Sequence, residues 1–528
     1  MKNKPNRVNR YSVLALAVSL LSVGAAEAAW IKTYGTANAD FGASIPSSQG
    51  GYYLSLNSIP SSTSTKPSAL IAKLNTAGKP LWTKKITSGA YDNFFISELG
   101  NGRLLLHGTT QASSSGATNA VWAEYTVNQS TGALTKVFSK TYKGSGDDDL
   151  FLTEDSTGAL WGQGSTTSFE GTTGNSDMII AKINPSTGVP IWSSVLNYDF
   201  DDSVAGFIPK GNQFILAANT RNSDGSIQKI VLGLLDSQGL PVSGSFKKYG
   251  GTGISSAIGI KAIANGNYLL YGVNRTSNTN QNSSGFIIKL NSSLGIVWSK
   301  QYNAGTDAGF DITEINENSN GSFTVNGFVR TPVYFTQGGI KFLLYQETHP
   351  ASMQISSAGA VQSKKSFEYQ AMDTATFYKS TNGNYLLSGQ TMDFDLTGQS
   401  NGNVDMLYGN FSSSVSPVWV KTFGAAKSES GFISAKSNGY RLSGSTNSWG
   451  AGSYDVLSGD LDTNGDVPGC PEIKEVTMTQ TTPTITAANL GWTPQAVNLI
   501  RKGAISNADI TLTVSSSTAL KATTVCTN

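Results

Sequence analysis

Three arginines have the residue type and spacing that a binding site for a small anion requires. Arg221, Arg275 and Arg330 occupy the same place in three consecutive sequence repeats, at the end of a strand and before a polar loop. The other repeats hold uncharged residues there, namely Ile59, Gln111, Thr167, Met392 and Asn447. A guanidinium is a permanent cation whose planar fork of donors suits sulfonate, carboxylate or phosphate oxygens. We therefore predict a substrate-binding sector. The alternative is that each arginine pairs with a local aspartate.

Aspartates recur just ahead of the innermost strand of most repeats, at Asp40, Asp92, Asp149, Asp202, Asp307 and Asp373. A repeated aspartate in a turn usually accepts backbone N–H groups. Asp311 differs, because it falls inside an innermost strand where other repeats have Ser44 or an apolar residue. Its carboxyl group would lie near Arg275 and Arg330 and could act as a general acid or base. Asp311 is thus the first candidate catalytic residue, followed by Asp307 and Asp373. A structural ion pair is the alternative.

Several familiar site types lack the residues that they need. The only histidines are His107 and His349, so a Ser-His-Asp arrangement, a histidine zinc site and a haem site are not predicted. The Asp147–Asp149 run lacks the spaced ligands of a calcium loop. Cys470 and Cys526 lie near the C-terminus without C-x-x-C spacing, and we expect them to form a disulfide that closes a terminal loop. The sequence predicts no cofactor and no metal centre.

The elements that position these residues follow from an internal repeat. An aromatic residue opens each unit, at Trp30, Trp82, Phe138, Trp192, Phe246, Trp298, Phe367 and Trp419. Asn-Gly pairs such as Asn101-Gly102 and Asn265-Gly266 predict type I′ hairpins between apolar runs. Four strands in a unit of about 50 residues are typical of a propeller blade. We predict an all-β, eight-bladed β-propeller in which Trp30–Gly35 supplies the outer strand of the last blade. A seven-bladed ring with one unit outside it is the alternative.

The chain divides into three segments in this interpretation: a signal peptide over 1–28, the propeller over 29–467, and a β-rich, disulfide-closed extension over 468–528, packed on the ring or on another subunit. The basic start, the apolar run and Ala26-Glu27-Ala28 are typical of a secretory signal, so we expect a periplasmic, outer-membrane-surface or extracellular protein. The longest repeat carries an insertion, roughly 333–354, expected to form a lid or a partner-binding loop. A formal net charge of +2 argues against nucleic-acid binding, and no later stretch could span a bilayer.

The Trp-x-Lys-x-Tyr-Gly units, as in Trp30–Gly35, resemble those of secreted bacterial propellers loosely related to quinoproteins, but the vicinal cysteine pair of the quinoprotein alcohol dehydrogenases is absent. Among exported propellers of this size, the chain most resembles the tetrathionate hydrolases of acidophilic sulfur-oxidising bacteria. That resemblance implies hydrolysis of tetrathionate to thiosulfate, sulfate and sulfur without an organic cofactor, an acid-dependent carboxyl group and a homodimer. The rival hypothesis is a non-catalytic secreted propeller that binds glycans or a cell-surface partner.

Overall fold

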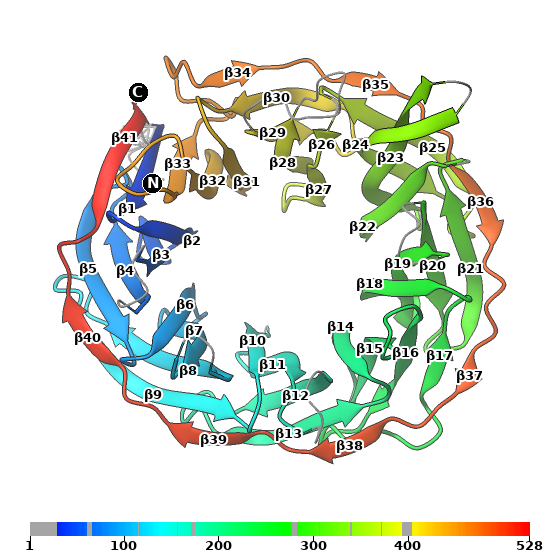
Figure 1. The fold of residues 1–528 in the computed structure, drawn as a ribbon, viewed down its shortest axis with the longest axis horizontal. Helices are drawn as coiled ribbons and strands as arrows, with labels where there is room; N and C mark the ends of the chain where they lie inside the picture. The colour runs from blue at the N-terminus through cyan, green and yellow to red at the C-terminus, as the bar shows by residue number, and fades with distance from the viewer. Residues whose placement is uncertain are drawn as a thin grey trace, which may run out of the picture.

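The protein is built from antiparallel sheets arranged in a propeller-like ring (Figure 1). The computed structural model describes residues 29–60, 66–113, 116–155, 157–169, 175–276, 282–305, 307–337, 340–370, 372–392 and 404–527. The single helical element of these residues is a short 3-10 turn, η1 (Ala264–Gly266). The segment 1–28, interpreted above as a signal peptide, lies outside the described residues. Within them, no helix is long and apolar enough to cross a membrane.

The strands fall into groups of four, each running from the centre of the ring outward (Figure 1). The innermost strands are β2 (Ala39–Pro46), β6 (Tyr91–Glu98), β10 (Asp148–Glu154), β14 (Asp201–Lys210), β18 (Ile254–Ile263), β22 (Gly309–Glu317), the interrupted pair β26 (Met372–Asp373) and β27 (Thr376–Lys379), and β31 (Glu429–Lys436). The second strands are β3 (Tyr52–Ile59), β7 (Leu104–Gln111), β11 (Leu160–Thr166), β15 (Gln213–Arg221), β19 (Asn267–Arg275), β23 (Phe323–Gln337), β28 (Tyr385–Met392) and β32 (Gly439–Thr446).

The outer half of each group follows the same order. The third strands are β4 (Ser68–Leu74), β8 (Thr118–Val127), β12 (Asp177–Ile183), β16 (Gln228–Leu235), β20 (Ser283–Leu290), β24 (Ile340–Ile355), β29 (Asp405–Phe411) and β33 (Asp455–Leu461). The fourth strands are β5 (Pro80–Thr87), β9 (Leu134–Lys143), β13 (Pro190–Asn197), β17 (Lys247–Tyr249), β21 (Ile296–Asn303), β25 (Val361–Glu368), β30 (Pro417–Phe423) and β1 (Trp30–Gly35). As the sequence predicts, β1 pairs antiparallel with β33 and completes the last group from the other end of the chain.

The repeated aromatic residue has a direct packing role. Trp30 on β1 covers Gly78, in the turn between β4 and β5 of the next group, and a Cβ at this glycine would lie 2.5 Å from the indole ring. The turn also accepts three hydrogen bonds from side chains of β1: Trp30 Nε1–H donates to Thr76 O at 2.8 Å, Lys32 Nζ–H to Ala77 O at 2.6 Å and Tyr34 Oη–H to Gly78 O at 2.6 Å. Because Gly78 has φ +69°, glycine is favoured there for both space and backbone conformation. This contact explains the recurrent aromatic and glycine residues of the repeat.

The core lies between facing sheets of neighbouring groups. In one cluster Trp122 of β8 packs with Leu150 of β10 and Ile179 of β12, all at most 2% exposed. The third strands are covered on both faces, which is why β4 and β12 are almost continuously apolar. Because both faces of these strands are buried between sheets, the strands lack the alternation of apolar and polar residues that is typical of a sheet with one face in water.

Two expectations about local structure differ from what is found. Among the Asn-Gly pairs that the structure describes, only Asn265-Gly266 has positive φ at both residues, at 61° and 67°. In Asn101-Gly102 only the glycine is left-handed, because Leu99 and Arg103 close a three-residue loop in which a single left-handed position suffices. The insertion near 333–354 is not an irregular loop, since β23 and β24 continue pairing as a long hairpin through Gln337 and Ile340.

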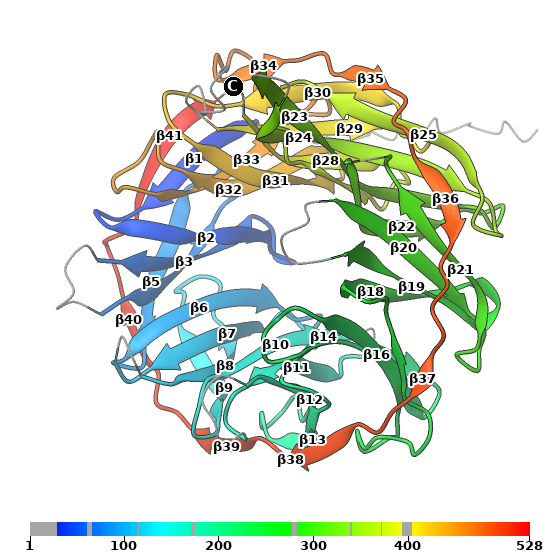
Figure 2. The same ribbon diagram turned by 45° about the vertical axis from the view of Figure 1, so that its right-hand side comes forward.

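The C-terminal segment forms no module of its own. It runs around the outside of the ring and adds a fifth strand to one group after another by pairing with the fourth strands, in the reverse of the order of these fourth strands in the sequence (Figure 2). We call residues 470–527 the belt. Its strands are β34 (Ile473–Glu475), β35 (Thr479–Thr481), β36 (Thr486–Asn489), β37 (Gln495–Ala496), β38 (Ile500–Gly503), β39 (Ser506–Asp509), β40 (Thr513–Ser516) and β41 (Lys521–Thr527). Met478, Ile485, Leu490, Leu499 and Ile505 insert from the belt into successive core clusters.

Candidate functional site

Most of the recurring carboxylates hold turns. Each accepts a hydrogen bond from the backbone N–H four residues earlier: Thr36 to Asp40 at 2.6 Å, Ser88 to Asp92 at 2.8 Å, Gly144 to Asp148 at 2.6 Å, Tyr198 to Asp202 at 2.6 Å, Tyr369 to Asp373 at 2.7 Å and Ala425 to Glu429 at 3.1 Å. All six are at most 1% exposed. Burial raises the pKa of Asp40 and Asp148, and that of Asp202 to about 6. The turn interpretation of the aspartate series is therefore correct.

Two members of the predicted series, Asp149 and Asp307, are placed differently. In the third group the turn residue is Asp148, not Asp149, because Asp148 lies opposite Thr166 and receives the Gly144 hydrogen bond. Glu429 fills the turn position of the last group, which has no member in the aspartate series. Asp307 is exposed, with φ 64°, and precedes β22. Asp373 is buried and engaged by Tyr369 N–H, by the Thr391 hydroxyl at 2.6 Å and by His349 Nδ1 at 3.2 Å.

Asp311 is brought together with two of the three arginines. Its Oδ2 forms a close ion pair with Arg330 Nη2 and lies 3.5 Å from Arg275 Nη2. The Asp311 residue is only 6% exposed, whereas the arginine side chains are 34% and 24% exposed. Among the described residues, nothing forms a hydrogen bond with buried Asp311 Oδ1 or with Arg275 Nε. Two arginines against one aspartate leave one net positive charge, and one buried acceptor and one buried donor have no hydrogen-bond partner among the described residues.

These groups line a cavity of about 380 Å³ between β18 and β19 on one side and β22 and β23 on the other. Its described lining is otherwise mostly apolar and consists of Ile254, Ile258, Val273, Ile312 and Phe328, together with the polar Gln228, Ser256 and Thr313. Apolar walls lower the local dielectric and strengthen the electrostatic attraction of an anion for the guanidiniums. The cavity therefore suits a small anion that also presents weakly hydrated surface.

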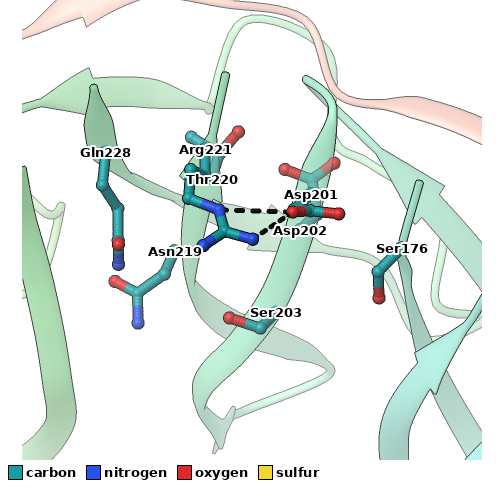
Figure 3. A pocket seen from close by; sticks show the side chains of 8 residues that line it. All are labelled: Ser176, Asp201, Asp202, Ser203, Asn219, Thr220, Arg221 and Gln228. Atoms are coloured by element: carbon teal, nitrogen blue, oxygen red, sulfur yellow. Dashed lines mark hydrogen bonds and ion pairs between the residues drawn. The ribbon is translucent and has the colours of Figure 1, made fainter. Parts of the chain in front are cut away.

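Arg221 does not join this site. Its guanidinium turns toward Asp201 (Figure 3), with Nε 3.2 Å and Nη2 2.5 Å from Asp201 Oδ2. This pair lines a separate cavity of about 360 Å³, which shares Gln228 with the cavity at Asp311. The predicted sector of three arginines is thus reduced to Arg275 and Arg330, and the local-aspartate alternative holds for Arg221.

Sequence reasoning missed the residue that corresponds to Asp311 in the third group. Asp149 lies opposite Ser165 and directly follows the turn residue Asp148. In the sixth group, Asp311 lies opposite Phe328 and directly follows Phe310, which occupies the equivalent turn position. The expectation that only Ser44 or apolar residues match Asp311 is therefore wrong. The signal was present in the Asp147–Asp149 run, but it needed the strand register to separate the three carboxylates.

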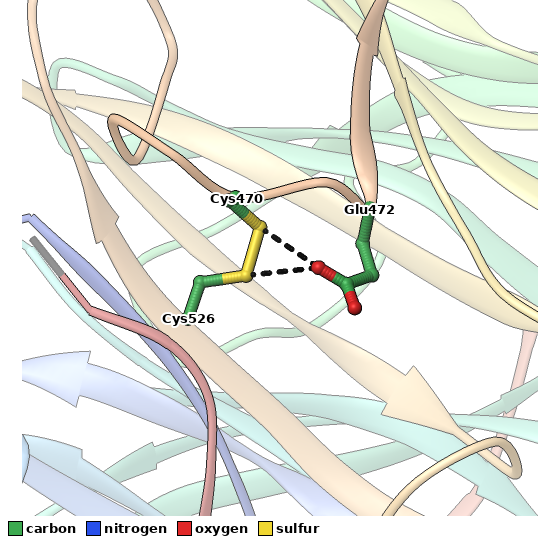
Figure 4. A group of neighbouring side chains, drawn as sticks. All are labelled: Cys470, Glu472 and Cys526. Atoms are coloured by element: carbon green, nitrogen blue, oxygen red, sulfur yellow. Dashed lines mark hydrogen bonds between the residues drawn. A yellow bond between two sulfur atoms is a disulfide. The ribbon is translucent and has the colours of Figure 1, made fainter.

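The structure gives little support to a metal centre. Within the described ranges, the group of potential ligands that lie close together is Cys470, Glu472 and Cys526, not the Asp147–Asp149 run. The two cysteines are joined by a disulfide (Figure 4), and Glu472 Oε2 lies 3.4 and 3.3 Å from their sulfurs. Disulfide sulfurs are not thiolates, the form in which cysteine binds a metal. This cluster is a covalent link between the two ends of the belt.

Comparisons with known proteins do not reveal the activity. No protein-family model matches the chain, and no curated protein does. Among solved structures, the polysaccharide lyase Uly1 aligns with 78% of this chain and 88% of its own, at 11% identity and a TM-score of 0.33. The exo-beta-1,3-galactanase 1,3Gal43A from Clostridium thermocellum aligns with 82% and 96%, at 12% identity and a TM-score of 0.25. Such low scores carry no conclusion, so the site must be interpreted from its own geometry.

Proposed function

We propose that the chain is an exported, eight-bladed β-propeller whose Asp311 cavity binds and hydrolyses a small sulfur oxyanion, tetrathionate, in acid. The observation that carries the proposal is the open Oδ1 of Asp311, buried beside two guanidiniums in a cavity with apolar walls. The substrate is suggested by the resemblance described above. Arg275 and Arg330 supply the positive charge that a terminal sulfonate requires.

The chemistry assigns separate tasks to these groups. A sulfonate accepts hydrogen bonds from Arg275, whose Nε is open, while the sulfur chain contacts Ile312 and Phe328. Asp311 Oδ1 accepts a hydrogen bond from water and orients its oxygen toward the sulfonate sulfur. The new S–O bond forms as the adjacent S–S bond breaks, so tetrathionate and water give sulfate, a disulfane monosulfonate dianion with three sulfur atoms, and two protons. That dianion then splits into thiosulfate and sulfur, which balances all atoms and charges.

The direct test measures thiosulfate release from tetrathionate by the purified protein, scanned from about pH 2 to 7 to bracket carboxyl titration. We expect turnover that peaks in acid, and its loss in Asp311→Asn. Asp307→Asn is the matched control, because Asp307 is exposed and outside the cavity. Equal turnover in Asp311→Asn and wild type would remove Asp311 from the mechanism. No turnover at any pH by folded protein would favour the binding module for glycans or a surface partner.

Processing and assembly belong to the same proposal. Removal of residues 1–28, export, and a homodimer without nucleic-acid partners are expected from the sequence and the resemblance. Mass spectrometry of the secreted protein and light scattering of the purified protein test these points. An intact residue 1–28 segment in secreted material would contradict the signal peptide, and a monomer over the working concentration range would contradict the dimer.

A further inference from the structure

We propose that the cavity between the second and third strand groups, around Asp149, Phe95 and Phe151, binds a small organic cation of the alkylammonium class. The cavity measures about 520 Å³ and is walled by β6 and β7 on one side and by β10 and β11 on the other. It occupies the same place between neighbouring groups as the cavity at Asp311 but lies elsewhere on the ring. The proposal is independent of tetrathionate hydrolysis.

Two aromatic rings are unusually accessible in this cavity. Phe95 on β6 is 37% exposed and Phe151 on β10 is 60% exposed, although both lie on innermost strands and line the pocket. Phe94, the neighbour of Phe95, is fully buried in the core. A ring face carries partial negative charge and attracts an ammonium group placed over it. The pair of rings therefore offers apolar surface that is complementary to a cation bearing methyl or methylene groups.

The charge of the lining favours a cation over an anion. The lining includes Asp147, Asp148 and Asp149, and no lysine or arginine occurs among its described residues. Asp148 holds its turn, and Asp147 accepts the Thr118 N–H at 2.7 Å, so these two have structural tasks. Burial lowers the pKa of His107, which stays neutral at pH 7 and adds no positive charge. Asp149 is left as the carboxylate that faces the cavity without a basic partner in its wall.

Comparison within the chain sharpens this point. Asp149 and Asp311 share one register position, but the second strands beside Asp311 end in Arg275 and carry Arg330, whereas Gln111 and Thr167 take those places beside Asp149. Asp311 is thus paired with arginine in its cavity, whereas Asp149, at the equivalent position, has no basic side chain in the wall of its cavity. Burial also raises the pKa of Asp149, and the hydrogen bond from the Leu150 backbone offsets only part of the cost of its charge. A bound cation would supply the remaining offset.

The experiment uses the full-length mature protein and choline as the probe, titrated at pH 7 by saturation-transfer NMR. The neutral isostere of choline, in which a tert-butyl group replaces the trimethylammonium, is titrated in parallel. We expect choline to bind about tenfold more tightly than the isostere, and Asp149→Asn and Phe151→Leu each to weaken choline binding by about five- to tenfold. Asp311→Asn is the control and should leave choline binding unchanged.

Equal affinity for choline and its isostere would overturn the proposal, because the cavity would then recognise only apolar surface. Unchanged binding in Asp149→Asn would equally overturn it, as would the absence of binding at tens of millimolar choline. Circular dichroism and thermal melting identify a variant that fails to fold. If Phe151→Leu is unfolded, the isosteric Asp149→Asn exchange still decides the outcome, because it leaves the shape of the cavity intact.

Discussion

Replacing both cysteines by serine should destabilise the protein by about 4 kcal/mol. The Cys470–Cys526 disulfide joins residues 56 positions apart and ties together the two ends of the belt. Cross-linking a loop of this length removes chain entropy from the unfolded state, and the usual dependence on loop length gives about 4 kcal/mol at 25 °C. The double variant Cys470→Ser/Cys526→Ser removes the link without leaving a free thiol.

Urea unfolding followed by tryptophan fluorescence measures this loss as a lower midpoint, and reduced wild type should behave like the double variant. Hydrogen exchange provides a local readout, because the amides of β34 and β41, next to the disulfide, should lose protection first. Glu472→Gln is the control, since it keeps the disulfide while changing the side chain beside it. A midpoint shift worth less than about 1 kcal/mol, with unchanged exchange, would show that strand pairing alone holds the belt and would refute the reasoning.

Three further predictions follow from buried groups. Burial raises the pKa of Asp202 to about 6, above its unfolded value of about 3.9, so folding favours the protonated carboxyl group. This preference contributes on the order of 3 kcal/mol of stability below pH about 4, and the contribution is lost as the pH rises through 6. Asp202→Asn should flatten the melting temperature between those pH values, and parallel profiles would contradict this. Arg441→Met should cost about 1–3 kcal/mol in thermal unfolding, because it removes a buried ion pair with Asp460 at 3.1 Å while Lys436, also 3.1 Å from Asp460, keeps that carboxylate paired; an unchanged melting temperature would argue against that role. Gly78→Ala should cost about 1–3 kcal/mol by urea unfolding, since its Cβ collides with Trp30; an unchanged midpoint would show that the turn can move.

The repeat was readable from the sequence because each unit must solve the same packing problem. An aromatic residue at the start of a fourth strand needs a glycine turn to cover, as Trp30 and Gly78 show, and both residue types recur at fixed spacing. The pairing of β1 with β33 followed from counting strands and finding one missing. These features are local and periodic, so no knowledge of the three-dimensional arrangement was needed to find them.

The site was only partly predictable, because its chemistry depends on which residues lie opposite each other in paired strands, and a shift of one residue changes these pairs. Asp311 near Arg275 and Arg330 was correctly anticipated, but Arg221 has its own aspartate across the strand pair, and sequence position alone does not show which arginine is neutralised. The exchange of Asp148 and Asp149 is an error of one residue. In a strand that shift moves a side chain to the opposite face, so it separates a turn residue from a cavity residue.

The sequence predicted a β-rich extension but not its path around the ring. Its strands are two to seven residues long, mostly exposed, and paired with partners from 50 positions away (Phe423 with Ile473) to 497 positions away (Trp30 with Thr527). Its apolar residues occur about once per strand group, a spacing that matches neither a helix nor a strand period. The spacing is explained by the ring, because each apolar residue that the belt inserts into the core reaches the outer edge of a different strand group.

The belt also imposes an order of assembly on a chain that is made from its N-terminus. All of its strands follow the ring strands in the sequence, so every fourth strand is complete before a belt strand exists to cover its edge. Uncovered edges invite pairing with other chains. The belt covers the most recently made edge first, when β34 joins β30, and reaches the oldest strand, β1, last through β41. Because β1 also waits for β33, both of its edges are satisfied only after β41 has been made. The first ring strand to be made is thus the last to be secured, and a chain that stops short of residue 521 leaves it open on its outer side.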